Sequence, residues 1–235
     1  MISKKRVLIK LSGEALMGNM KYGIDVSTLS FIANEIKKVY DQDYQICLIN
    51  GGGNIFRGIE GAYEGIDRST SDYMGMLATV MNALSMQSSL EKIKVPTRVQ
   101  SAISMSQIAE PYIRRKAVRH LEKDRVVIFA AGTGNPYFST DTAASLRASE
   151  LNCELIVKAT KVDGIFDKDP VKNSDAKLIK EISYQEVLEK NLKVMDSTAI
   201  SLAKDTNIPI MITNIFKENS ILNALNYKGK YSIVK

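Results

Sequence analysis

Short apolar runs alternate along the chain with longer stretches in which apolar residues recur every three or four positions. Continuous apolar runs are typical of strands buried on both faces of a parallel sheet, and the wider spacing is typical of amphipathic helices. The pattern predicts an α/β fold: a three-layer αβα sandwich with a mostly parallel central sheet. The expected strands are 6–11, 44–50, 96–100, 125–131, 153–159, 209–213 and 231–234, and the expected helices are 25–42, 67–93, 111–123, 139–152, 183–190, 197–207 and 219–226.

The stretch 67–93 is apolar on nearly all sides, with Met74, Leu77, Val80 and Met81 among its residues. A helix with this pattern is usually buried on more than one side. We therefore expect it to contribute to a subunit interface as well as to the core.

The composition is that of a globular protein, with 45% apolar residues in a chain of 235. This length favours one domain over residues 1–235. No apolar run is long enough to cross a membrane, and no signal-like segment is present, so we expect a cytoplasmic protein without a membrane partner. Cys47 and Cys153 lie in apolar runs without metal-ligand spacing, which predicts two reduced core thiols. His120 is the single histidine, so no metal site is expected from protein side chains.

The net charge of +6 is compatible with nucleic acid or with small anionic ligands such as nucleotides. A nucleic-acid-binding regulator is a weak alternative, because the basic residues are spread along the chain and no recognition motif occurs. We therefore expect no nucleic-acid partner.

Glycine-rich or polar clusters follow four of the expected strands. These clusters are 10–13, 51–54, 132–135 and 160–169. Because ligands of open α/β sheets bind at the carboxyl ends of the strands, the clusters are expected to form one site. Glycine lets the backbone approach an anion closely, so the two glycine runs suit two phosphorylated ligands.

Several charged side chains near these clusters could serve phosphate chemistry. Lys10 lies inside an apolar strand, where its charge needs a counter-charge such as a phosphate, unless the side chain reaches solvent at the strand end. Arg57 could form a fork with a phosphate. Asp141 is either a favourable first-turn acid or a group that orients lysines or Mg²⁺, and Asp72 could cap its helix or bind a ribose. No P-loop, protein-kinase or dinucleotide-binding signature occurs.

Five segments closely resemble the bacterial UMP kinases, a family within the amino-acid kinase superfamily, and the resemblance covers nearly the whole chain. They are KLSGEAL (10–16), GGGNIFRG (51–58), DYMGMLAT (72–79), GTGNPYFSTD (132–141) and KATKVDG (158–164). The resemblance implies an amino-acid-kinase-like fold and transfer of a phosphoryl group from ATP–Mg²⁺ to UMP in pyrimidine nucleotide biosynthesis. It also implies a homohexamer.

The resemblance assigns roles to individual residues. Catalytic roles fall to Lys10, Asp141 and a second lysine, either Lys158 or Lys161. The ATP-binding residues would be Lys10, Leu11, Ser12, Gly13, Gly53, Arg57, Thr160, Phe166 and Asp169. The UMP-binding residues would be Gly52, Asp72, Thr133, Gly134, Asn135, Pro136, Tyr137, Phe138, Ser139 and Thr140.

Two alternatives stay open within this interpretation. Another member of the superfamily would phosphorylate a small carboxylate or carbamate instead of UMP. GTP and UTP are effectors of many relatives, and the segment 18–23 resembles a region linked to GTP activation. Gln87 and Glu91 stand where basic residues would favour a triphosphate, so the allosteric response is left open.

Overall fold

The computed structural model describes residues 4–57, 65–168, 170, 172–173 and 175–235. Nine strands of these residues form one sheet. The strand order is β4-β3-β5-β2-β1-β6-β10-β11-β9, and every neighbouring pair except β10 and β11 is parallel. The strands are β1 (Arg6–Leu11), β2 (Gln45–Asn50), β3 (Thr97–Ser101), β4 (Glu110–Pro111), β5 (Val126–Ala130), β6 (Leu155–Thr160), β9 (Glu181–Ile182), β10 (Ile210–Asn214) and β11 (Ser232–Val234). All seven expected strands are therefore present.

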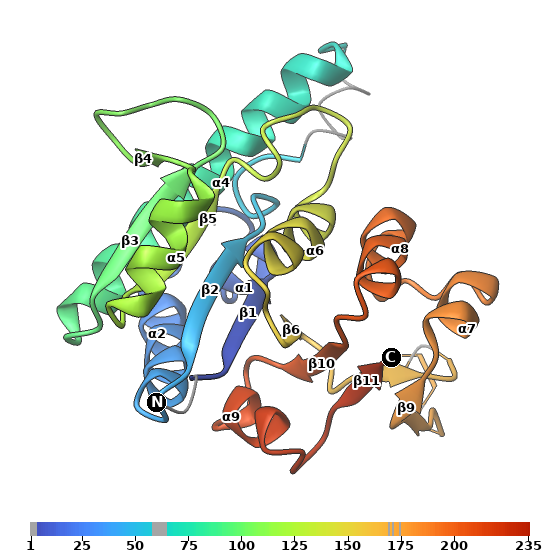
Figure 1. Ribbon diagram of the computed structural model, residues 1–235. Coiled ribbons are helices and arrows are strands. Elements are labelled where there is room, and N and C mark those ends of the chain that lie inside the picture. The colour runs from blue at the N-terminus through green and yellow to red at the C-terminus, as the bar shows by residue number, and fades with distance from the viewer. Residues whose placement is uncertain (1–3, 58–64, 169, 171, 174) are drawn as a thin grey trace.

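Helices cover both faces of this sheet, which confirms the αβα sandwich (Figure 1). One face packs against α2 (Val26–Tyr40), α4 (Arg68–Lys92) and α9 (Ser220–Leu225). The other packs against α5 (Arg114–Glu122), α6 (Thr140–Glu150) and α8 (Ser197–Asp205), with α7 (Tyr184–Glu189) beside α8. No helix of the described residues is long and apolar enough to cross a membrane.

Side chains of the central strands alternate between the two layers, and this alternation directs Lys10. Ile9 and Leu11 of β1 pack towards α2 and α4, whereas Leu8 packs towards α6. Lys10 lies two positions from Leu8 and therefore shares the α6 face. In β6, Lys158 shares that face for the same reason, since it lies two positions from Ile156.

Polar residues begin the helices that border the site. Asp25 caps α2 by accepting a hydrogen bond from the Thr28 backbone N–H at 2.7 Å, and Ser139 caps α6 through the N–H groups of Asp141 and Thr142. The expectation that Asp72 could cap the long helix is wrong, because Asp67 occupies the cap position five residues earlier.

The remaining differences from the predicted elements are short. The helix expected from residue 111 begins at Arg114, because Glu110 and Pro111 pair with β3 instead. Three two-residue strands lie in the expected loop after residue 160, namely β7 (Ile165–Phe166), β8 (Leu178–Ile179) and β9, and a four-residue helix, α1 (Gly13–Leu16), follows β1. The two cysteines are buried and free, with their sulfur atoms 4.0 Å apart.

The central strand β1 is buried from Val7 to Leu11, so its packing should dominate local stability. We predict that Ile9→Ala lowers the free energy of unfolding by about 2–5 kcal/mol, because it removes buried apolar contacts and leaves a cavity in the core. Ile108→Ala makes the same chemical change at a side chain that is 55% exposed rather than 0%, and it should cost less than about 0.5 kcal/mol. Urea unfolding of both variants checks the difference, and equal losses would contradict it.

Candidate functional site

The four polar segments expected at one edge of the sheet do lie together. They follow β5, β2, β1 and β6, which are four adjacent parallel strands in the sheet. Their carboxyl ends therefore meet at one edge, where the amino end of α6 also arrives. This arrangement confirms that the segments share one location.

At the centre of this edge, Asp141 lies between two lysines. Lys10 and Lys158 are direct neighbours in the register of β1 and β6. The Asp141 Oδ1 atom is 2.7 Å from Lys10 Nζ, and its Oδ2 atom accepts a hydrogen bond from Lys158 Nζ at 2.8 Å. The three side chains are only 8%, 14% and 16% exposed for Lys10, Asp141 and Lys158. Asp141 therefore orients lysines, and Lys10 does not reach solvent.

The electrostatics of this cluster follow from burial and mutual charge. Burial acts to raise the pKa of the Asp141 carboxyl, but the charges of Lys10 and Lys158 outweigh it and hold the pKa below its usual value. Burial is the main cause that lowers the pKa of Lys158, Asp141 partly offsets it, and Lys10 lowers it further. Two cations around one carboxylate leave a net positive charge at the centre of the site.

The glycine segments approach one another too closely to admit side chains. A Cβ atom at Gly13 would lie 2.7 Å from the Gly51 carbonyl oxygen, and one at Gly52 would lie 2.7 Å from the carbonyl oxygen of Gly75 in α4. Within the described part of the chain, the N–H groups of Gly52 and Gly53 donate no hydrogen bond. The run Gly51–Gly53 thus presents free backbone donors suited to phosphate oxygens.

A cavity of about 550 Å³ opens on the Lys158 side of the cluster. Of the residues expected to bind ATP, Thr160 and Phe166 line it, together with Lys158. Asp169 lies outside the described residues. Sequence reasoning missed several apolar lining residues from distant segments, namely Leu192, Val194 and Ile212.

A second cavity of about 140 Å³ lies on the other side, between the glycine runs and α4. Its lining includes six of the residues expected to bind UMP: Gly52, Asp72, Thr133, Phe138, Ser139 and Thr140. The other four, Gly134, Asn135, Pro136 and Tyr137, belong to the same loop but not to the lining.

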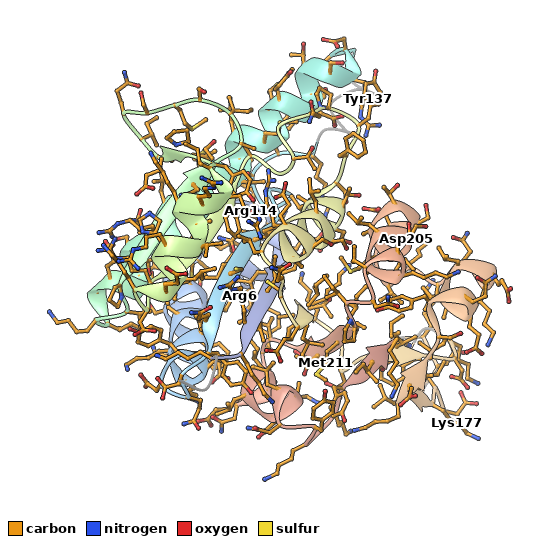
Figure 2. The ribbon with its side chains drawn as sticks, viewed as in Figure 1. Arg6, Arg114, Tyr137, Lys177, Asp205 and Met211 are labelled. Atoms are coloured by element: carbon orange, nitrogen blue, oxygen red, sulfur yellow. The ribbon has the colours of Figure 1, made fainter. Side chains whose placement is uncertain are left out.

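Asp72 fastens that loop to the start of α4. Its Oδ2 atom accepts a hydrogen bond from the Tyr137 backbone N–H at 2.8 Å and another from Arg68 Nε at 2.9 Å. The Arg68 guanidinium lies 5.5 Å from the centre of the Tyr137 ring. Figure 2 shows Tyr137 beside this end of α4.

Lys161 and Arg57 meet a carboxylate that the sequence did not single out. Both ion-pair with Glu14 of α1: Arg57 through Nη2 and Lys161 at 3.7 Å. Lys161 is therefore directed away from Asp141 and lines a separate hollow beside Met20 and Phe216. Glu14 could have been noticed only as an acid next to Ser12 and Gly13, the expected phosphate-binding residues.

Comparisons with known proteins agree with this geometry. Residues 5–214 match the model of the amino acid kinase family. The structure is similar to the crystal structure of UMP kinase from Ureaplasma parvum, with 38% identity, a TM-score of 0.94 and complete coverage of both chains. It is also similar to UMP kinase from Bacillus anthracis, with 37% identity, a TM-score of 0.93 and coverage of 98% of this chain and 96% of the other.

The central cluster generates a prediction about pH. In Asp141→Asn, Lys158 stays buried beside Lys10 without its counter-charge, so its pKa falls further below 10.5. At a pH between this lowered pKa and 10.5, Lys158 is protonated in the unfolded state but not in the folded state. The free energy of unfolding of the variant therefore rises with pH in this range. Near neutral pH we expect the free energy of unfolding of the variant to be about 3–5 kcal/mol lower than that of the wild type. This deficit should shrink as the pH approaches about 10.

Urea unfolding of wild type and variant at several pH values measures this deficit. Asp205→Asn, at an exposed position at the end of α8, is the control and should show no such trend. A deficit that is independent of pH would contradict the charge argument.

Proposed function

This chain belongs to the amino acid kinase family, and we propose that its site transfers the γ-phosphoryl group of ATP to UMP, giving ADP and UDP. The observation that carries the proposal is the lysine–aspartate–lysine cluster between two cavities. Lys158 lines the larger cavity, whereas Thr140, the chain neighbour of Asp141, lines the smaller one. The full-length likeness to two UMP kinases supports the assignment of donor and acceptor.

The chemistry needs positioning and charge neutralisation more than it needs a base. The acceptor is a phosphate oxygen of UMP, and a phosphate monoester has already lost most of its second proton at pH 7. In phosphoryl transfer, cations and backbone N–H groups stabilise the charge that spreads over the transferred group. We assign that task to Lys10, Lys158 and the backbone N–H groups of Gly52 and Gly53.

Asp141 would hold the two lysines rather than accept a proton. Both of its oxygen atoms are occupied by ammonium groups, so it keeps Lys10 and Lys158 side by side despite their repulsion. We assign the second catalytic role to Lys158 rather than Lys161, because Lys161 meets Glu14 instead.

Mg²⁺ would enter with ATP rather than be held by a protein cage. No group of three or more histidine, cysteine, aspartate or glutamate side chains that could hold a metal ion occurs among the described residues. Mg²⁺ often keeps several waters and binds mainly to substrate phosphates, which suits such a site. When bound, it would neutralise charge on the phosphate oxygens.

An apolar stripe on α4 supports a subunit interface, which the homohexamer implied by the resemblance requires. Tyr73, Met74, Leu77 and Met81 are exposed in the single chain, with Leu77 at 52% and Met81 at 53%. These positions share the helix face turned away from the sheet. A continuous apolar stripe of this kind fits a second copy of the chain.

Other parts of the assignment stay predictions. They are the division into one domain, the cytoplasmic location, the place in UTP and CTP synthesis and the response to GTP or UTP.

The acceptor assignment predicts UMP-dependent ADP formation from ATP and Mg²⁺, much faster than with CMP, AMP, carbamate or an amino acid. Asp72→Asn should raise the KM for UMP by about 10-fold or more, because it weakens charge-assisted hydrogen bonds that hold the acceptor loop. The KM for ATP should change little. Asp205→Asn is the control, and steady-state kinetics measure both constants. Equal rates with UMP and CMP would contradict the proposal.

The interface assignment predicts that wild type has a mass about six times the 26.1 kDa chain. Leu77→Glu together with Met81→Glu should lower this mass, because burying a carboxylate at an apolar interface is unfavourable. Val26→Glu, at another exposed apolar position, should leave it unchanged. Analytical ultracentrifugation distinguishes the outcomes, and a monomeric wild type would contradict the assignment.

A further inference from the structure

Two buried asparagines below the Gly51–Gly53 run form a closed pair. Asn82 of α4 donates through Nδ2 to Asn54 Oδ1 at 2.7 Å, and Asn54 donates through Nδ2 to Asn82 Oδ1 at 3.0 Å. The side chains are nearly inaccessible, at 0% for Asn82 and 2% for Asn54. Buried polar groups are costly unless they are satisfied, and this pair is.

The remaining donor of each amide reaches a backbone carbonyl. Asn82 Nδ2 donates to the Gly51 carbonyl oxygen at 2.7 Å, and Asn54 Nδ2 donates to the Gly23 carbonyl oxygen at 2.8 Å. Each amide therefore uses both N–H groups and its oxygen. Because carbonyl oxygens only accept, both amides must place their nitrogen atoms towards Gly51 and Gly23, which leaves one arrangement of the network.

This network holds the glycine run at both ends. At the start of the run, Asn82 holds the Gly51 carbonyl. Asn54 directly follows the run, and its carbonyl oxygen accepts a hydrogen bond from the Gly23 N–H at 2.7 Å. The free N–H groups of Gly52 and Gly53 lie between these anchors. Glycine has no side chain of its own to restrain its backbone. The Gly52 N–H belongs to the same peptide unit as the Gly51 carbonyl that Asn82 holds. The next peptide unit follows from there towards Asn54, and its carbonyl accepts hydrogen bonds from the Ile55 and Phe56 N–H groups.

The same face of α4 also supports the second glycine run. Thr79 lies three residues before Asn82, and its Oγ1 atom accepts a hydrogen bond from the Ala131 backbone N–H at 2.8 Å. Ala131 has a positive φ of 62° and directly precedes Gly132. One helix face thus contacts the start of both runs.

We propose that Asn82 and Asn54 are positioning residues for phosphoryl transfer: they fix the Gly51–Gly53 backbone so that the Gly52 and Gly53 N–H groups meet the phosphates. This inference rests on the proposed function and deepens it. The two asparagines do not contact the nucleotides themselves. Their removal should misdirect the N–H groups while the two cavities keep most of their lining.

The test uses the full-length protein with ATP, Mg²⁺ and UMP. Asn82→Ala, Asn54→Ala and the double variant are compared with wild type for kcat and both KM values. We expect kcat to fall by about 10–100-fold, since a small misplacement of positioning groups can cost that much. Both KM values should stay within about 3-fold. The kcat of the double variant should be no lower than that of the more impaired single variant, because the effects of residues that act as a unit are not additive.

Two control variants distinguish a loss of positioning from a loss of stability. Leu90→Ala removes a fully buried side chain two turns further along α4 and should lower the unfolding midpoint while leaving kcat within about 3-fold of wild type. Ser85→Ala removes a hydroxyl that donates to the Met81 carbonyl oxygen of the same helix, and it should change neither the unfolding midpoint nor kcat. If Asn82→Ala does not fold, Asn82→Asp keeps the shape, loses the donor to Gly51 and should show the same fall in kcat.

A kcat within 10-fold of wild type in folded Asn82 and Asn54 variants overturns the inference. So does a Leu90→Ala variant that loses as much kcat as they do, or losses that multiply in the double variant. A wild-type protein that does not phosphorylate UMP overturns the proposed function instead, so the two failures are distinguishable.

Discussion

The ion pair between one carboxylate and two lysines is the constraint on which the site depends. Lys10 and Lys158 stand next to each other on β1 and β6 and point to the same face of the sheet. Without Asp141 their charges would repel within a mostly buried space, where charge is costly. Asp141 removes most of this cost and ties the amino end of α6 to the two central strands. It also leaves the cluster with an excess positive charge directed at the carboxyl edge of the sheet, where the four polar segments meet.

The second constraint is α4, whose different faces have different roles. Towards the sheet it contributes Thr79 and Asn82, which hold the starts of the two glycine runs. Near its beginning Asp72 holds the loop at Tyr137. Its outer face presents the exposed apolar stripe at Leu77 and Met81. A helix that is apolar nearly all round is usually buried on more than one side, and this is the basis of the proposed subunit interface.

Much of this architecture could be predicted from sequence, for identifiable reasons. Each long strand is a continuous apolar run, and parallel strands put their carboxyl ends together, so the location of the site followed from pattern alone. The partner of Lys10 did not, because it lies 131 positions away in sequence (141 − 10) and depends on the packing of α6. The short strands β4, β7, β8 and β9 were missed since two residues carry no periodicity. Asn82 was missed because one polar residue in a long apolar helix gives no sign of its partners.

The sequence left the choice between Lys158 and Lys161 open, and the structure distinguishes the two. Lys158 lies inside the expected strand 153–159, and Lys161 lies two residues beyond its end. In a strand, alternation sends residues two apart to the same face, so Lys158 shares the face of Ile156, which packs against α6. Lys161 lies beyond the last residue of β6, where the alternation no longer applies, and it meets Glu14 at the surface. A continued strand would also separate the two side chains, because residues three positions apart point to opposite faces. Of these two lysines, only Lys158 therefore reaches Asp141.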